Sequence, residues 1–256
     1  KFYVNYTRSD WSTVIEEVQA STTNPDVASA ATRNIIMVYS QPFDNHNGGT
    51  IKFGPDGMLW ISSGDGGAGN DPGDRAQNKN LVLGKLLRID VDGDDFPGDT
   101  NRDYRIPTDN PFASGGGAGE VAHYGLRNPW QFAFDLRENN GFGGLTIADV
   151  GQDRWEEVSY AKPGALGLNF GWKIREGAHN TGLTSTGTPP FVDPFWEYSN
   201  LTDGCSVTGG EIIRDPRLGV DLWGKYLVTD FCGAWLRAVP TNFNLETGEM
   251  LSSFPV

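Results

Sequence analysis

Three stretches of the chain end an aliphatic strand pattern on an aspartate in the same local setting. They are residues 60–65, 145–149 and 226–230, and each follows a turn rich in Gly, Asp or Asn. The aspartates Asp65, Asp149 and Asp230 recur at intervals of roughly 80 residues, and such self-similarity indicates a repeat architecture. Since strands dominate each unit, the sequence predicts an all-β protein of the β-propeller type, with equivalent aspartates at one mouth of its channel.

Composition narrows the functional classes. The formal net charge of −13 leaves no basic stripe to release counterions, which argues against nucleic acid as a partner. The 34 Gly and 15 Pro with an ordinary charged fraction are typical of a loop-rich β-protein. No run of 18 apolar residues occurs, so no membrane span is expected.

Hydrophobic alternation places the expected strands. No linker divides the chain, so residues 1–256 are expected to form one domain of roughly four blades. A ring must close, so we expect this propeller to be incomplete. Residues 21–34 are expected to be a loop with a helical turn, residues 92–120 an insertion and residues 177–194 a loop. The expected strands are residues 2–6, 13–18, 34–39, 50–53, 59–62, 85–90, 131–135, 145–148, 157–161, 170–174, 210–214, 225–229 and 235–239.

Two cysteines flank a pair of consecutive strand patterns near the C-terminal end. Cys205 and Cys232 would meet across the sheet and form one disulfide in an oxidising compartment, which indicates a periplasmic or extracellular location. The alternative is two buried free thiols.

Two glycine-rich segments carry candidate catalytic groups. His46 lies in the turn Asn-His-Asn-Gly-Gly, where an imidazole could act as a general base near neutral pH. Asp65 begins a loop whose glycines allow a ligand to approach the backbone closely. The alternatives are a turn histidine bonded to backbone and a flexible loop with a turn aspartate.

Two further segments offer groups for a ligand or a cation. Arg127 and Asn128 precede Pro129 and present forked donors on a stiff turn. Residues 149–157 form a loop rich in carboxylates and carbonyls, the hard oxygen ligands that calcium prefers. A surface turn and a solvated acidic loop are the alternatives.

A second, weaker calcium site is expected in an aspartate-rich segment. Its alternating oxygens resemble the start of a calcium loop, although Gly at the sixth position and Glu at the twelfth are missing, which excludes an EF-hand. The candidate ligands are Asp90, Asp92, Asp94, Asp99 and Asp103.

The order of the motifs along the chain carries a resemblance to a known family. The strings are HNGG, FGPDGMLWISSGDGG, QNKNLVLGKLLRIDVDGD, YRIPTDNPF, YGLRNPWQFAFD, IADVGQDRWEEV and LNFGWKIREG. Together they resemble the glucose/sorbosone dehydrogenase family, which includes soluble quinoprotein aldose dehydrogenases, and the Hedgehog-interacting protein carries a related propeller. The resemblance implies a six-bladed propeller that binds pyrroloquinoline quinone (PQQ) and calcium.

The resemblance implies a role for each matching position. His46 would take the proton from the sugar C1 hydroxyl while hydride passes to the quinone, which yields the lactone. Asp65 would lie beside this base, and Arg127 and Asn128 would contact the quinone oxygens. Asn70 stands where the family has a cofactor-contacting Gln.

The remaining implied roles concern calcium, substrate and a cofactor carboxylate. The backbone carbonyls of Gly151 and Gln152 would bind the calcium that polarises the quinone. Glu156 would approach the substrate, and Arg214 stands where soluble glucose dehydrogenases have a lysine that pairs with a cofactor carboxylate.

The chain also departs from the family pattern. The family's first blade would lie before Lys1, and the basic residues of the last blades would follow Val256. Asn45 replaces an Asp. We therefore expect a sugar dehydrogenase with an aldose substrate and an electron acceptor, or, alternatively, a non-catalytic propeller that binds a protein or glycan.

Overall fold

The computed structural model describes residues 1–244 and 246–250, and this part of the chain is almost entirely β-structure. Two three-residue 3-10 helices, η1 (Arg137–Asn139) and η2 (Pro216–Leu218), interrupt the strands. The strands are β1 (Phe2–Thr7), β2 (Thr13–Ala20), β3 (Ala28–Tyr39), β4 (Ile51–Phe53), β5 (Leu59–Ser63), β6 (Lys85–Ile89), β7 (Val121–Tyr124), β8 (Pro129–Phe134), β9 (Leu145–Asp149), β10 (Trp155–Ala161), β11 (Arg175–Glu176), β12 (His179–Asn180), β13 (Trp196–Ser199), β14 (Val207–Ile212), β15 (Tyr226–Asp230) and β16 (Leu236–Val239).

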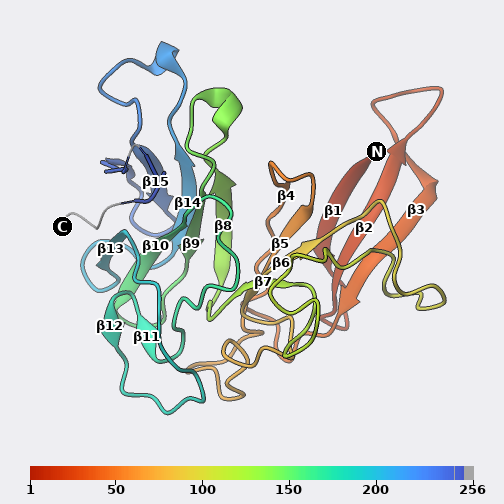
Figure 1. Ribbon diagram of the computed structural model, residues 1–256, viewed down its shortest axis with the longest axis horizontal. Coiled ribbons are helices and arrows are strands. Elements are labelled where there is room, and N and C mark those ends of the chain that lie inside the picture. The colour runs from red at the N-terminus through yellow and green to blue at the C-terminus, as the bar shows by residue number, and fades with distance from the viewer. Residues whose placement is uncertain (245, 251–256) are drawn as a thin grey trace.

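The strands form four antiparallel sheets that follow one another along the chain. Sheet I contains β1–β3, sheet II β4–β7, sheet III β8–β10 with β13, and sheet IV β14–β16. A small hairpin of β11 and β12 lies in the long connection between β10 and β13. Sheets I and II lie on the right of Figure 1 and sheets III and IV on the left. This is the arrangement of propeller blades, so the predicted fold class is confirmed.

A separate hydrophobic core joins each pair of consecutive sheets. Strand alternation directs every second side chain to one face, so each sheet packs against the sheet before it and the sheet after it. Sheets I and II share Ile15, Ile36, Leu59, Ile61 and Leu87. Sheets II and III share Trp60, Leu86, Phe132 and Ile147, and sheets III and IV share Val158, Trp196, Tyr226 and Val228.

Most of the expected strands are present, but three expectations about them were wrong. The expected loop of residues 21–34 contributes its second half to β3, which begins at Ala28. Residues 170–174 are not a strand, because the backbone N–H groups of Phe170 and Trp172 donate to the end of β7 and to Gly125 instead. The fourth strands of sheets II and III, β7 and β13, were not among the expected strands.

Cys205 and Cys232 form the expected disulfide, with their Cα atoms 5.6 Å apart. The bond joins the segment before β14 to the segment after β15. In the described part of the chain, no helix has the length and apolar character needed to cross a bilayer.

Candidate active site

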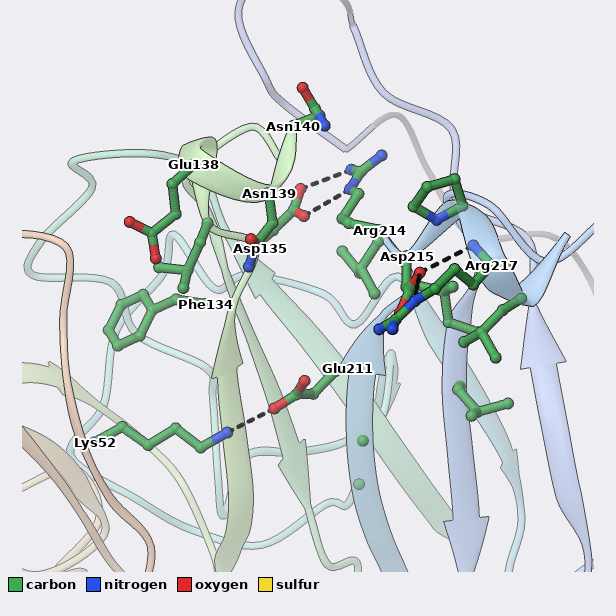
Figure 2. A pocket seen from close by; sticks show the side chains of 18 of the residues that line it. Lys52, Phe134, Asp135, Glu138, Asn139, Asn140, Glu211, Arg214, Asp215 and Arg217 are labelled. Carbon is green, nitrogen blue, oxygen red and sulfur yellow. Dashed lines mark hydrogen bonds and ion pairs between the residues drawn. The ribbon is translucent and has the colours of Figure 1, made fainter. Parts of the chain in front are cut away.

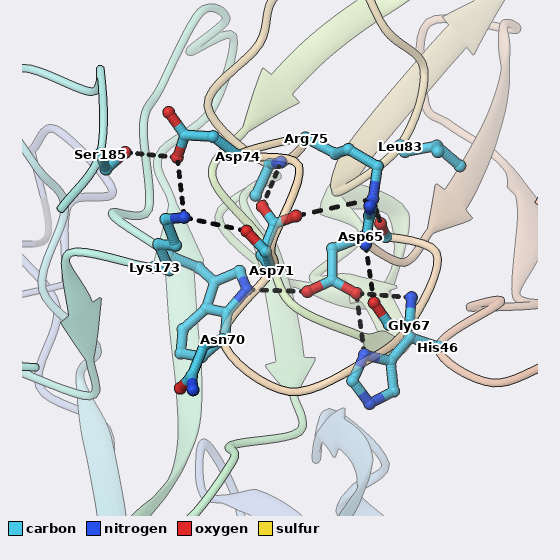
Figure 3. A network of polar contacts seen from close by, with 12 residues as sticks. His46, Asp65, Gly67, Asn70, Asp71, Asp74, Arg75, Leu83, Lys173 and Ser185 are labelled. Carbon is cyan, nitrogen blue, oxygen red and sulfur yellow. Dashed lines mark hydrogen bonds and ion pairs between the residues drawn. The ribbon is translucent and has the colours of Figure 1, made fainter. Parts of the chain in front are cut away.

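The central feature of the candidate site is a histidine–aspartate pair between the segment before β4 and the end of β5. His46 Nδ1 lies 2.8 Å from Asp65 Oδ1, and the aspartate is fully buried (Figure 3). Because a carboxylate can only accept, Nδ1 carries the proton and Nε2 keeps its lone pair. Nε2 has no hydrogen-bond partner among the described residues, so it is available to accept a proton.

A close backbone contact allows the histidine to reach the aspartate. A Cβ atom on Gly64 would lie 2.0 Å from the carbonyl oxygen of His46, so only glycine fits there. His46 itself has a φ of 53°, in the left-handed region, which turns its side chain back toward β5. The backbone N–H of Asp65 donates to the carbonyl of Arg127 at 2.7 Å, which joins this turn to sheet III.

Arg127 and Asn128 lie against the same turn and are held by the aspartate that ends β9. Asp149 accepts the backbone N–H of Arg127 at 2.8 Å and that of Asn128 at 2.6 Å. The Asn128 Oδ1 accepts the N–H of Gly48 at 3.1 Å, so Asn128 lies beside the segment that carries His46. Burial raises the pKa of the Asp149 carboxyl, although the two N–H donors and the Arg127 charge oppose this shift.

The Arg127 guanidinium is buried and only partly satisfied. Its Nη1 donates to the carbonyl of Val150 at 2.9 Å, and its Cζ lies 5.6 Å from the centre of the Trp172 ring. Its Nε has no partner among the described residues. A buried cationic donor in this state leaves one N–H group without an acceptor oxygen.

The three repeated aspartates occupy equivalent places in their sheets but accept hydrogen bonds from different groups. Asp149 and Asp230 both accept backbone N–H groups from the segment that precedes the first strand of their own sheet. Asp65, in the equivalent place of sheet II, accepts the His46 side chain instead. The repeat therefore provides a carboxylate at each second strand, and in sheet II it orients an imidazole.

The loop of residues 150–155 is fixed by a single carboxylate oxygen. Glu176 Oε1 accepts the backbone N–H groups of Gln152, Asp153 and Arg154 at 2.8, 2.7 and 2.8 Å. The side chain of Gln152 in turn exchanges two hydrogen bonds with Asn70. The carbonyl oxygens of Gly151 and Gln152 accept no hydrogen bond from the described residues, so these hard oxygen ligands remain available.

A cleft of about 490 Å³ lies next to these loops. Its lining includes Asn70, Gln152, Trp155 and Trp172, but neither His46 nor Arg127. Its volume falls in the range of small-molecule sites, and it combines aromatic surfaces with amide and carboxylate groups. Trp172 connects it to the histidine–aspartate pair, since the indole Nε1 donates to Asp65 Oδ2 at 2.8 Å.

A larger cavity of about 880 Å³ lies at the opposite end of the sheets, and Arg214 belongs to it (Figure 2). Arg214 forms a two-pronged ion pair with Asp135, with distances of 2.8 and 2.7 Å. Asp135 follows the end of β8 farthest from Asp149, so the expectation that Arg214 contacts a cofactor at the site is corrected.

The expectation that Glu156 approaches a substrate stays a prediction. Glu156 is fully buried, and its Oε2 accepts the N–H groups of Gly151 at 3.2 Å and Val207 at 2.9 Å. Burial raises its pKa to about 7. This carboxylate joins the loop after β9 to β14 through Oε2, while Oε1 has no hydrogen-bond partner among the described residues.

The predicted second calcium site is not assembled. Asp90 and Asp99 pair with Arg105 and Arg102, and the segment forms local turns rather than one cage. In the described residues, the only close group of metal-ligand side chains is Cys205, Asp230 and Cys232. Its two sulfur atoms are joined in the disulfide. The aspartates that do not converge are Asp90, Asp92, Asp94, Asp99 and Asp103.

Sequence reasoning missed two residues that hold the pair. Trp172 donates to Asp65, and Arg75 donates to the backbone oxygens of Asp65 at 2.5 Å and Gly67 at 2.7 Å. Both lie within strings that carry the family resemblance or beside them, but their partners are distant in sequence or are backbone atoms, so no spacing indicates the contact.

The fold and the cluster define a β-propeller with a histidine–aspartate pair, a buried guanidinium and free carbonyl oxygens at one end. The model of the family described as Glucose / Sorbosone dehydrogenase matches residues 1–215, and the chain belongs to this family.

Individual relatives agree with this assignment. The chain is 35% identical over 250 residues to the HIPL1 protein of Arabidopsis thaliana, which covers 87% of this chain and 34% of that protein. It is 32% identical over 157 residues to the human Hedgehog-interacting protein, which covers 57% of this chain and 22% of that protein. The chain thus spans about a third or less of the length of these relatives.

Among solved structures, the fold is similar to the PQQ-bound form of Aldose Sugar Dehydrogenase from Streptomyces coelicolor. The TM-score is 0.66 at 27% sequence identity, and the match covers 94% of this chain and 58% of that chain.

Proposed function

We propose that this chain carries the catalytic end of a quinoprotein aldose dehydrogenase, which oxidises a sugar at C1 to the lactone. The observation that carries the proposal is the His46 Nδ1–Asp65 contact of 2.8 Å beside the buried Arg127 and Asn128. The family membership and the PQQ-bound structural neighbour support the same chemistry.

In this proposal His46 is the general base. Asp65 holds the imidazole as the Nδ1–H tautomer, so Nε2 accepts the proton of the sugar C1 hydroxyl. The buried carboxylate also stabilises the imidazolium that forms when the proton arrives. Asp65 is fully buried and the His46 side chain is 10% exposed, so the contact between Nδ1 and the carboxylate is shielded from water.

The available donors and acceptors fit a quinone and a calcium ion. Arg127 has an unpartnered buried Nε and would hold a quinone oxygen together with Asn128. The carbonyls of Gly151 and Gln152 would hold calcium, and Asn70 would contact the cofactor. When bound, PQQ supplies the hydride acceptor and calcium polarises it.

We also propose the wider setting of the protein. The disulfide favours a location outside the reducing cytosol, in the periplasm or outside the cell. An electron acceptor would reoxidise the cofactor. The three cores shared by consecutive sheets support residues 1–256 acting as one domain.

Turnover of aldoses with PQQ, calcium and a redox dye tests the proposal. The natural full-length protein should bleach the dye, and His46→Ala should lower kcat by at least about 10²-fold, the usual contribution of a general base. Arg217→Ala, which removes an exposed side chain at the opposite end of the sheets, is the control and should keep wild-type turnover. Absence of turnover across a broad aldose panel would sink the proposal.

A second candidate function is a binding module for a protein or glycan. The 32% identity to the Hedgehog-interacting protein favours it. The same His46→Ala variant separates the two functions, because a module should keep its affinity for a partner when this imidazole is removed.

A further inference from the structure

Trp172 touches both charged groups of the candidate centre. Its indole Nε1 donates to Asp65 Oδ2 at 2.8 Å, and its ring lies 5.6 Å from the Arg127 guanidinium carbon. The side chain is only 2% exposed. We propose that Trp172 is a positioning residue that locks the Asp65 carboxylate and thereby the tautomer of His46. This inference rests on the proposed function.

The two carboxylate oxygens of Asp65 accept hydrogen bonds from different donors. Oδ1 faces His46 Nδ1 at 2.8 Å and the N–H of Gly67 at 2.9 Å. Oδ2 is left to the indole of Trp172. A carboxylate whose two oxygens have different fixed donors cannot turn about its terminal bond without losing one of them. The indole therefore keeps Oδ1 directed at the imidazole.

The position of Trp172 is itself fixed by a junction between two loops from different sheets, here named the loop latch. Gln77 Nε2 donates to the Trp172 carbonyl at 2.6 Å. Lys173 Nζ donates to the carbonyl of Asp71 at 2.9 Å, on the neighbouring loop (Figure 3). The loop latch consists of Asp71, Asp74 and Gln77 from the connection between β5 and β6, and Asn169, Lys173, Ser185 and Thr186 from the connection between β10 and β13.

Asp74 is the most highly connected member of the loop latch. Its Oδ1 accepts the Ser185 hydroxyl at 2.6 Å, and its Oδ2 accepts the N–H and hydroxyl of Thr186 at 2.8 and 2.7 Å. These bonds join the two loops through protein groups alone, so the loop latch would preorganise Trp172. The orientation of His46 would therefore depend on loop-latch residues that do not contact the sugar.

The primary test is Trp172→Phe, which keeps an aromatic ring over Arg127 but removes the N–H donor. We expect kcat to fall about tenfold or more with KM within about twofold, because the base is misplaced while binding is retained. The acidic limb of the pH–rate profile should move to higher pH, since a carboxylate without its indole donor holds the imidazolium more strongly.

A second readout needs no cofactor. Nitrogen-15 spectra of the imidazole of His46 should show the Nδ1–H tautomer alone in the wild type and a mixture in Trp172→Phe. The matched control is Trp60→Phe, which also removes a buried indole N–H from a carboxylate, here Asp56 at 3.3 Å. This control should leave both the kinetics and the tautomer unchanged.

Asp74→Gly is a second variant, useful if Trp172→Phe does not fold. Glycine accommodates the Asp74 φ of 50° and removes the side chain that joins the loops, so the tautomer should again become mixed. Wild-type spectra and pH profile in the folded variants would overturn the positioning role. A locked tautomer that is lost in these variants, in a protein that oxidises no aldose, would support the positioning role and reject the dehydrogenase.

Discussion

At the scale of single residues, the candidate site depends on close approach rather than on the number of charged groups. Asp65 is fully buried, yet it binds the imidazole because the backbones of His46 and Gly64 nearly touch. Arg127 reaches the same place because its backbone N–H is held by Asp149. A side chain at position 64 would push the His46 backbone away and separate the imidazole from the Asp65 carboxylate.

Gly64→Ala tests this close approach. The new Cβ would lie 2.0 Å from the His46 carbonyl oxygen and would displace the histidine segment. We expect turnover to fall at least about tenfold. Overpacking should also lower the free energy of unfolding by about 1–3 kcal/mol in chemical denaturation.

Gly69→Ala is the matched control on the same loop. A Cβ there meets only Gln152 Oε1, at 3.8 Å, which is ordinary contact. Equal losses in Gly64→Ala and Gly69→Ala would show that the effect belongs to the loop in general and not to the contact with His46.

Sequence could supply His46, Asp65, Arg127 and Asn128, because each lies in a short string with a glycine or proline that marks its turn. It could not supply Trp172, whose hydrogen bond to Asp65 spans 107 residues. It also misassigned Arg214, since the charge matched but the side chain lies at the far end of β14. Contacts between sheets are not encoded in local spacing.

At the scale of elements, the fourth strand of sheet II carries a buried imidazole. His123 on β7 is fully buried, its Nδ1 accepts the N–H of Leu168 at 3.3 Å, and its ring lies 5.8 Å from both Trp60 and Phe170. Burial lowers the pKa of this imidazole to about 3. The side chain is therefore neutral in the folded protein throughout the working pH range.

This burial predicts an acid-sensitive step in stability. The His123 pKa is about 3 when folded and near 6.5 when unfolded, so unfolding takes up a proton between these values. The neutral His123 side chain contributes fully to the free energy of unfolding above pH 6.5. This contribution falls by about 1.4 kcal/mol per pH unit as the pH decreases toward 3.

Denaturant unfolding of His123→Phe at several pH values checks this expectation. In His123→Phe, the free energy of unfolding should fall less steeply as the pH decreases from 6 to 4, because no imidazole at this position takes up a proton on unfolding. Phe132→Leu, which perturbs the same core without a titrating group, should lower stability by the same amount at every pH. An unchanged slope in His123→Phe would contradict the assignment.

Element prediction succeeded for strands with a clear aliphatic run or alternation and missed two strands that lack one. The strands β5, β9 and β15 each have five residues with clear alternation or an aliphatic run, and each was expected. By contrast, β7 and β13 have four residues and lie beside long polar connections. Their pairing is decided by the neighbouring strand rather than by their own sequence.

At the scale of the whole molecule, two of the ion pairs between sheets differ in burial and therefore in their contribution to stability. Arg214 and Asp135 join sheets IV and III with side chains 9% and 0% exposed. Lys52 and Glu211 join sheets II and IV with side chains 38% and 72% exposed. Breaking a buried pair leaves an unpaired charge, whereas an exposed pair contributes little.

Arg214→Ala should therefore lower the free energy of unfolding by about 3 kcal/mol, because Asp135 would be left buried and unpaired. Turnover per folded molecule should stay at the wild-type level, measured at saturating PQQ. Lys52→Ala is the control and should cost less than about 1 kcal/mol. Loss of turnover without loss of stability in Arg214→Ala would instead support the expectation that Arg214 contacts the cofactor.

Because an aspartate recurs at the second strand of sheets II, III and IV, the same place in each sheet offers a carboxylate that could orient a neighbouring side chain. In sheets III and IV this carboxylate accepts backbone N–H groups from the segment ahead of the first strand, whereas Asp65 accepts the His46 imidazole. The described sheets thus have three similar corners, and in one of them the carboxylate pairs with an imidazole. A second histidine–aspartate pair would require a different loop ahead of β8 or β14, since the aspartate is already in place.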